Sequence, residues 1–210
     1  MRSADQARVL GPRALATRRR ILDATAAQLE TGGLRDFKVV DVARSVGTSP
    51  ATFYQYFPTV EEAILALSEE VNQETGRLRE IVESPWRGVG GLDLAREFVA
   101  EYVEHFDRHR AVLRIRNLAA QEGDARFRKT RNESLLPLTQ ALAAKIEQHQ
   151  QEGTVSTRLN AFAAGGAMMA LMERMAAFAR EFELRGVDRD ALIETTALIV
   201  WQTVAGEHAA

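Results

Sequence analysis

Several polar side chains in one short segment have the chemistry needed to contact a nucleic acid. Ser49, Thr52, Gln55 and Tyr56 follow one another closely along the chain. A glutamine amide can bond adenine at N6 and N7, and hydroxyl groups can donate to phosphate oxygens. These residue types therefore indicate contact with a duplex, provided that the local structure turns the side chains outward.

The sequence before these residues predicts a short helix that ends in a tight turn. Val39, Val42 and Ala43 recur at helical intervals and form an apolar stripe. Gly47 lies where the helix must stop, because glycine tolerates the left-handed backbone conformation of a helix end.

A second helix is predicted to begin at Pro50. Ser49 is a favourable N-cap, and proline at the first helical position loses no hydrogen bond. Phe53 and Phe57 are four residues apart, so they share one face and are expected to pack on the first helix. This arrangement is typical of a helix-turn-helix DNA-reading unit, although an ordinary helical hairpin has the same local pattern.

Uncharged residues are expected to read the bases. An apolar group such as Val40 or Ala51 can touch a thymine methyl, and Gln55 can bond adenine, so we expect A·T pairs under the second helix. The expected base-reading residues are Val40, Ser49, Pro50, Ala51, Thr52 and Gln55.

Basic residues are concentrated in the N-terminal quarter. Residues 1–60 contain nine Arg or Lys and five Asp or Glu, whereas residues 61–210 contain eighteen and twenty-four. Such asymmetry indicates a phosphate-binding head on an acidic body, although any single cation can simply belong to a solvated helix end. The expected phosphate contacts are Arg13, Arg18, Arg19, Arg20, Lys38 and Arg44, with Thr52 suited to phosphate or base edge.

Short motifs between Arg18 and Leu67 match a known pattern. They are ILDA at Ile21–Ala24, Gly33, VVDVA at Val39–Ala43, Gly47, TFYQYF at Thr52–Phe57, and Pro58 with Glu61. This segment resembles the DNA-binding domain of the tetracycline-repressor (TetR) family of bacterial regulators. The resemblance implies that Tyr54 and Tyr56 contact the sugar–phosphate backbone, Tyr54 being the one better explained by a purely structural role.

Two positions depart from the family pattern. Similar proteins usually carry a phosphate-binding lysine two residues after the proline, where this chain has Val60, and open the second helix with Thr or Ser, where it has Lys38. We hypothesise that the charge of Lys38 supplies what these positions otherwise supply by hydrogen bonding.

Composition places the chain in the all-α class. Runs of β-branched or aromatic residues are sparse among the 210 residues, cysteine is absent, and no apolar run is long enough to span a bilayer. We therefore expect a cytoplasmic protein with no membrane association, no disulfide, no thiolate chemistry and no signal peptide.

The expected organisation is a flexible basic arm at residues 1–12, a three-helix DNA-binding domain at 13–60, a connecting helix at 61–83, and a ligand-binding and dimerisation bundle at 84–210. A capping box at Thr59–Glu62 starts the connecting helix, which is expected to continue to about Glu83. The first helix is expected at 13–31, and body helices at 92–107, 109–122, 125–151, 157–184 and 188–206, about nine helices in all.

Dimerisation is expected because paired heads read two half-sites across a two-fold axis. Small and apolar residues in the last two helices suit such a surface, although small residues can equally line a core. The expected interface residues are Phe162, Ala163, Gly166, Ala170, Ala177, Leu192, Thr196, Ile199, Val200 and Thr203. The resemblance implies a four-helix contact from these helices.

A hydrophobic effector pocket is expected inside the body, although the same side chains can form plain core. Its expected residues are Trp86, Phe98, Tyr102, Phe106, Leu113, Asn117, Leu118, Met168, Met169, Met172, Met175 and Phe178. Tyr102, Asn117, Gln121 or Glu173 would supply a polar handle. The cluster formed by Arg108, His109, Arg110, Arg114 and Arg116 is expected at the surface.

The resemblance implies a repressor that binds a palindromic operator as a homodimer and is released when a small hydrophobic effector changes the spacing of the two heads through the connecting helix.

Other classes of protein have weaker support. The histidines show no metalloprotease spacing and the chain has no nucleotide-binding fingerprint, so we expect no enzyme and no cofactor. His105 and His109, four apart, suit a metal in principle, but a solvated pair is favoured and no metal site is expected. A helical adaptor or small-molecule-binding protein without DNA binding is the alternative, and it predicts no salt-dependent affinity for duplex DNA.

Overall fold

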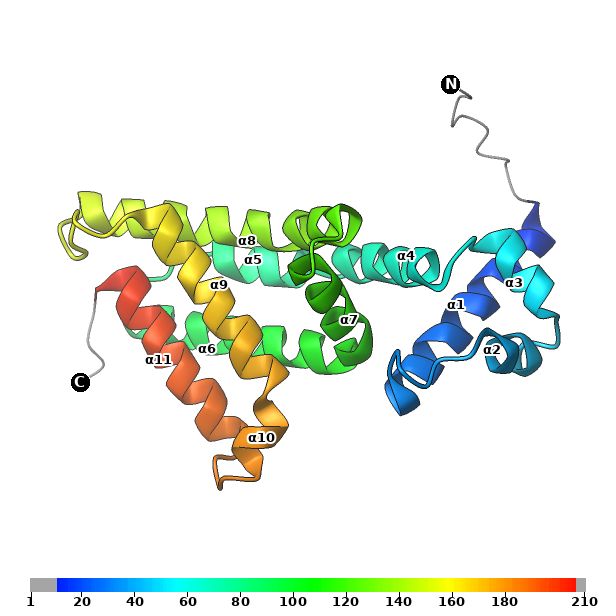
Figure 1. Cartoon of the computed structure of the whole chain (residues 1–210). Coiled ribbons are helices and arrows are strands. Elements are labelled where there is room, and N and C mark those ends of the chain that lie inside the picture. The colour runs from blue at the N-terminus through cyan, green and yellow to red at the C-terminus, as the bar shows by residue number, and fades with distance from the viewer. Residues whose placement is uncertain (1–10, 207–210) are drawn as a thin grey trace. The chain divides into compact units, whose positions relative to one another are not determined.

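The computed structural model describes residues 11–206, which contain eleven helices and no strand (Figure 1). The chain divides into two compact units, Met1–Leu67 and Ser68–Ala210. The all-α prediction is confirmed. Most of the arm predicted at residues 1–12 lies outside the described residues, and none of the helices among residues 11–206 has the length and apolar character that crossing a bilayer requires.

The first unit is built on α1 (Pro12–Gly32), which buries one stripe of its surface. The buried residues of α1 are Ile21, Leu22, Thr25 and Leu29. Gly33 ends the helix with its N–H on the carbonyl of Leu29, in a left-handed conformation at φ 66° that suits glycine. The predicted first helix is confirmed.

Two short helices complete the reading unit, α2 (Val39–Ser45) and α3 (Pro50–Tyr56). Gly47 turns the chain at φ 67°, and Ser49 caps α3 by accepting from the N–H of Thr52 at 3.2 Å. Phe53 is fully buried, and its ring centroid lies 5.9 Å from that of Phe57. The predicted helix-turn-helix is therefore present, with a core of few side chains.

The second unit is a helical bundle. Its elements are α4 (Val60–Gln73), which begins in the first unit, then α5 (Gly76–Glu83), α6 (Gly88–Arg108), α7 (Arg110–Gln121), α8 (Ala125–Gln151), α9 (Ala161–Ala177), α10 (Ala179–Glu183) and α11 (Arg189–Ala205). Helix α8 packs along α9 and α7, and α6 packs on α11 (Figure 1).

The prediction of one continuous connecting helix at 61–83 is wrong, because this segment divides into α4 and α5 around Glu74 and Thr75. The Thr75 hydroxyl donates to the carbonyl of Asn72 at 2.8 Å, and the Asn72 amide leaves α4 to donate to the carbonyl of Thr130 at 2.8 Å. These side-chain bonds compete with the helical backbone ladder, and Gly76 follows at once.

The helix predicted at 157–184 also divides, into α9 and α10 at Phe178. The guanidinium of Arg110 donates to the carbonyls of Ala176 and Ala177, at 3.2 and 2.9 Å. Those carbonyls would otherwise accept from N–H groups four residues later, so a side chain from α7 sets the end of α9.

Two glycines allow helices of the second unit to approach closely. A Cβ atom on Gly165 would lie 2.7 Å from the carbonyl oxygen of Thr139, so α9 can meet α8 only without a side chain there. A Cβ on Gly91 would overlap the ring of Trp201, which is buried between α6 and α11. The periodicity of apolar residues in the sequence does not predict either of these close contacts.

Candidate nucleic-acid interface and ligand domain

The fourteen residues predicted to contact DNA all lie at least partly at the surface of the first unit. Val40 on α2 and Tyr54 on α3 keep 46% and 50% of their surface exposed although they are apolar or aromatic, and Gln55 on α3 is exposed as well. The packing of Phe53 and Phe57 sets the opposite face of α3 inward. The fold therefore offers an outward surface of the composition that base reading needs.

The hydroxyl groups at the start of α3 already have partners. Ser49 Oγ lies 3.1 Å from Thr52 Oγ1 in addition to capping the helix. A hydroxyl can accept and donate at once, so Thr52 can still approach a phosphate, whereas Ser49 is held mainly by its structural role. Tyr54 is more exposed than Tyr56, whereas from the sequence Tyr54 was expected to be the more structural of the two.

The arginines of α1 differ in function. Arg20 donates to the carbonyl of Val46 at 2.5 Å and so ties α1 to the turn, and the guanidinium of Arg18 lies 5.0 Å from the centre of the Phe57 ring. Arg19 pairs with Asp23 at 2.8 Å. Part of the cluster predicted to bind phosphate therefore holds the unit together.

Other cations of the first unit remain available to phosphates. Within residues 11–67, Arg13 and Lys38 form no ion pair, and Arg44 pairs only with Asp41, through a side chain that is 76% exposed. Lys38 occupies the N-cap position of α2, where its side chain makes no capping bond. Its charge is consequently free to face an anion.

The predicted dimerisation residues separate into two groups. Phe162, which is 54% exposed, and Ala163, Ala170 and Ile199 lie at the surface, with Gly166, Ala177 and Thr203 half-buried. Leu192, Thr196 and Val200 are buried inside the chain's own core, so they cannot line a surface and the prediction for them is corrected. The exposed face of α11 contains Ala191, Thr195 and Ile199 instead.

The predicted pocket residues mostly form tightly packed core. Trp86, Phe98, Tyr102, Phe106, Leu113, Met169 and Met172 are buried, whereas Leu118 is more than half exposed and Asn117, Met168, Met175 and Phe178 are half-buried. The rings of Trp86 and Phe98 pack edge to face at 5.8 Å, and the Trp86 indole N–H donates to the carbonyl of Ile81 at 3.0 Å. These contacts fix the aromatic end of the core.

A groove of about 310 Å³ lies between α8 and α9. Its walls include Leu135, Met169 and Phe162, with Arg131 and Glu173 as the charged part of the lining. Of the residues predicted for the pocket, Met169 and the possible polar handle Glu173 line this groove. A ligand there would meet both an apolar wall and an ion pair.

The ion pair belongs to a buried polar network that the sequence did not reveal. Arg116 is only 2% exposed and donates to Asn117 at 3.1 Å and to Asn72 at 3.2 Å, and its guanidinium lies 4.0 Å from Glu173. Arg131 donates to the same glutamate. Arg116 was predicted at the surface, and this is wrong for Arg116 and for Arg110, both of which are buried.

The network perturbs the groups that it contains. Burial raises the pKa of the Tyr102 hydroxyl, and the carboxylate of Glu173 raises it further. Burial lowers the pKa of Arg116, although Glu173 opposes that effect. Spacing offered a signal for Arg116, because it follows Val112 and Leu113 by four and three residues on the buried face of α7.

Each of the two units matches the model of a known protein family. Residues 21–67 match the model of "Bacterial regulatory proteins, tetR family", and residues 78–210 match "Tetracyclin repressor-like, C-terminal domain". The HTH-type transcriptional regulator EthR of Mycobacterium tuberculosis is 28% identical over 184 residues, which are 86% of this chain and 83% of that protein.

Solved structures of similar fold cover nearly the whole chain. The fatty acid degradation regulator FadR from Bacillus halodurans superposes with a TM-score of 0.67 at 16% identity, over 91% of this chain and 95% of the other. Thermus thermophilus FadR, a repressor solved in complex with lauroyl-CoA, superposes with a TM-score of 0.59 at 20% identity, over 91% and 97%. At these identities the likeness concerns the fold.

Proposed function

Since this chain belongs to the TetR family of ligand-responsive, DNA-binding transcription regulators, we propose that it represses transcription as a homodimer on a palindromic operator and is released by a small hydrophobic effector. Members of the family are transcription factors rather than enzymes. The observation that carries the proposal is the outward face of α3, whose polar and small side chains are exposed over a buried Phe53.

Operator binding would use two kinds of contact. Gln55 reads adenine, with Val40 and Ala51 against thymine methyl groups, while Lys38 and Arg44 neutralise phosphates. Tyr54 is supported as a backbone contact by its exposure. The DNA-binding residues, the interface and the pocket are all proposals for this chain.

Dimerisation would use the exposed face of α9 and α11. Phe162, Ala170 and Ile199 form an apolar surface there, and Gly166 has open space around its Cα. Small residues let two helices approach closely, as a four-helix contact between copies requires. Two copies would then present α3 to half-sites about one duplex turn or a multiple apart.

A hydrophobic effector would bind in the core beside Met169 and Met172, on the inner side of the α8–α9 groove. Methionine side chains repack with little cost, so an apolar chain can displace them. Arg131 and Glu173 would contact a polar group of the same ligand. The lauroyl-CoA complex of Thermus thermophilus FadR shows that this fold can hold a ligand with a long apolar chain.

Release from DNA requires that the effector prefer one head spacing over another, because equal affinity for both spacings shifts nothing. The α4–α5 segment joins the two units along the chain and is the element through which this preference would pass. We place the protein in the cytoplasm, where its operator lies.

The base-reading proposal is tested with Gln55→Ala. A preferred duplex is first selected from a random-sequence library with the wild-type chain, and affinities are then measured by fluorescence anisotropy. The variant is expected to lose about 1–3 kcal/mol at one or two base positions and to keep its affinity for unrelated duplexes. Equal weakening on every sequence would remove the reading role, and no salt-dependent binding by the wild type would favour a helical adaptor.

The interface proposal is tested with Gly166→Arg, because open space around Gly166 lets the chain itself accept the side chain. Sedimentation analysis is expected to show a wild-type dimer and a variant monomer, and circular dichroism is expected to show the same helicity in both. A variant dimer as stable as the wild type would place the interface elsewhere.

A further inference from the structure

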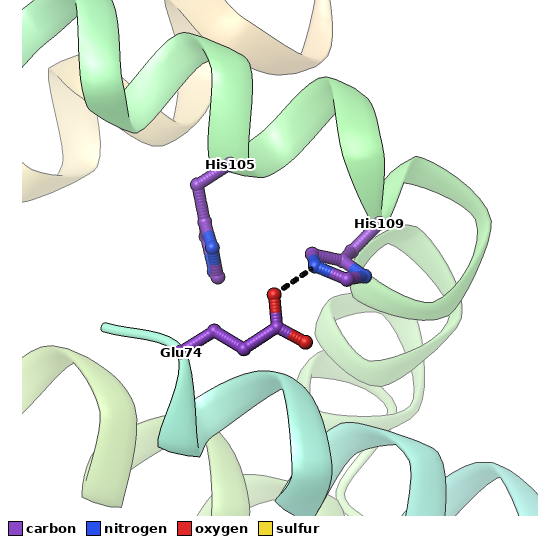
Figure 2. A group of neighbouring side chains, drawn as sticks. All are labelled: Glu74, His105 and His109. Carbon is purple, nitrogen blue, oxygen red and sulfur yellow. Dashed lines mark hydrogen bonds and ion pairs between the residues drawn. The ribbon is translucent and has the colours of Figure 1, made fainter. Parts of the chain in front are cut away.

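Three potential metal ligands meet in the second unit, and none of them lines the groove. Glu74 lies in the break between α4 and α5, and His105 and His109 lie near the end of α6 (Figure 2). One ligand atom from each residue falls within 4.8 Å of the others. Figure 2 shows the carboxylate directed toward the two imidazole rings from the opposite side of the cluster.

The state of His105 distinguishes this cluster from a solvated histidine pair. His105 is only 5% exposed, so its ring is largely shielded from solvent. Its ring contacts that of His109, with centroids 5.2 Å apart. A largely buried imidazole beside a second imidazole and a carboxylate brings together three ligand groups of the kind that bind transition-metal ions.

The second histidine and the carboxylate are already close to binding geometry. His109 Nε2 lies 2.9 Å from Glu74 Oε2. Three ligands at tetrahedral zinc distances lie roughly 3.4 Å from one another, so rotamer changes of about 1 Å suffice to enclose an ion. The break in the helix at Glu74 is what turns this residue toward α6.

We propose that Glu74, His105 and His109 form a binding site for a divalent transition-metal ion of the zinc class. Two imidazoles and one carboxylate suit Zn²⁺, Ni²⁺ or Cu²⁺ and disfavour Mg²⁺ and Ca²⁺, which prefer oxygen ligands. Three protein ligands leave a fourth position for water or another donor. The bound ion joins the α4–α5 break to the end of α6.

One neighbouring cation competes with the ion. Arg108 Nη1 lies 3.8 Å from Glu74 Oε2, and the same side chain also reaches Glu104 at 3.4 Å. Arg108 is about half exposed and can remain with Glu104 when the ion takes the Glu74 carboxylate. Replacing this arginine should therefore strengthen metal binding.

The test is calorimetric titration of the full chain, without a polyhistidine tag and after treatment with chelator, with ZnSO₄ and separately with MgCl₂. One Zn²⁺ per chain and no Mg²⁺ binding are expected. His109→Ala and Glu74→Gln, both at accessible positions, should each weaken Zn²⁺ binding by about tenfold or more. His105→Asn should do the same, but its burial makes it the less direct variant.

Matched variants decide the assignment. Glu104→Gln removes an acid from the same helix and should leave the Zn²⁺ affinity within about twofold of wild type, while Arg108→Gln should raise it. Absence of Zn²⁺ binding by the wild type overturns the site. Wild-type affinity in both His109→Ala and Glu74→Gln overturns it equally. Because no DNA is present, the result is independent of the proposed regulatory function.

Discussion

The candidate functional residues are exposed in the first unit and mostly buried in the second. In the first unit every predicted DNA contact is exposed or half-exposed above a small core around Phe53. In the second unit most predicted pocket residues are buried, and charged groups in the same unit, such as Arg116 and Glu173, pair with one another. A surface that reads DNA can be complete before its ligand arrives, whereas a buried site is occupied by its own core until a ligand displaces it.

This difference has a physical origin in the size of the ligand. A duplex is contacted by an outward helix face, and that face needs only a fixed orientation. A small effector needs enclosure, which requires side chains from several helices to pack around it. The first unit therefore depends on a few core contacts, and the second on many.

The largest expected effect concerns the small core of the first unit. Phe53→Ala removes a fully buried ring and should cost about 3–5 kcal/mol, enough to unfold the reading unit and abolish DNA binding while the second unit stays folded. Hydrogen exchange followed by mass spectrometry checks both units separately. Tyr54→Ala, which removes a half-exposed neighbour, is the control. If the amides of residues 11–67 exchanged as slowly in Phe53→Ala as in the wild type, the first unit would not depend on this small core.

Next in size is a pair of adjacent glycines in the second unit. Gly165→Ala places a Cβ against the Thr139 carbonyl and should destabilise the chain by about 1–3 kcal/mol. Gly166→Ala meets no atom within 4 Å and should be neutral or stabilising by up to about 1 kcal/mol. Chemical denaturation of both variants measures the difference, and equal stabilities would show that α8 and α9 do not pack as described.

A buried lysine in the second unit gives a pH dependence. Lys145 is nearly buried, lies 5.4 Å from the centre of the Trp86 ring, and donates to the carbonyl of Ser84. Burial lowers the pKa of Lys145 from 10.5 to about 8. Between these values the unfolded chain holds the proton and the folded chain does not, so stability rises as the pH rises through this window.

Lys145→Met removes that titration. From pH 7.5 to 9.5 the wild type should gain about 2 kcal/mol of unfolding free energy relative to the variant. Urea denaturation at both pH values measures this difference, with Lys129→Met, a change of an exposed lysine on the same helix, as the control. Parallel pH profiles for wild type and Lys145→Met would show that the ammonium group is solvated.

The smallest expected effect is electrostatic and belongs to the surface of the first unit. If Lys38 contacts one phosphate, Lys38→Ala should reduce the slope of log affinity against log salt by about 1 while the sequence preference stays unchanged. Anisotropy titrations at several salt concentrations measure the slope, and Lys129→Ala is the matched control. An unchanged slope would mean that the α2 terminus does not face the phosphate backbone.

Local signals made the first unit readable from the sequence. Gly47, the Ser49 cap and the spacing of Phe53 and Phe57 act within a few residues of one another, so the helix-turn-helix follows from backbone and capping preferences alone. The same applies to the body helices with clear ends, such as α8 and α11. Here the predicted limits and the structure agree closely.

Long-range contacts decided what local signals missed. Arg110 ends α9 from sixty-six residues away in the sequence, and Asn72 reaches Thr130 across fifty-eight residues where α4 stops. Leu192, Thr196 and Val200 do lie on one face of α11, as their spacing predicts, but that face is buried rather than available to a second copy. Only the packing of α11 against α6 shows which face is covered.

The amino-acid sequence by itself determined the helical class, the reading unit and the exposed character of its contacts, since each depends on preferences expressed within one or two helical turns. Only the tertiary structure decided which arginines are buried, where α4 and α9 end, and that Glu74 meets His105 and His109. The reason is that burial and hydrogen-bond competition depend on partners distant along the chain, which a local pattern such as the spacing of Arg116 on α7 can suggest but not specify.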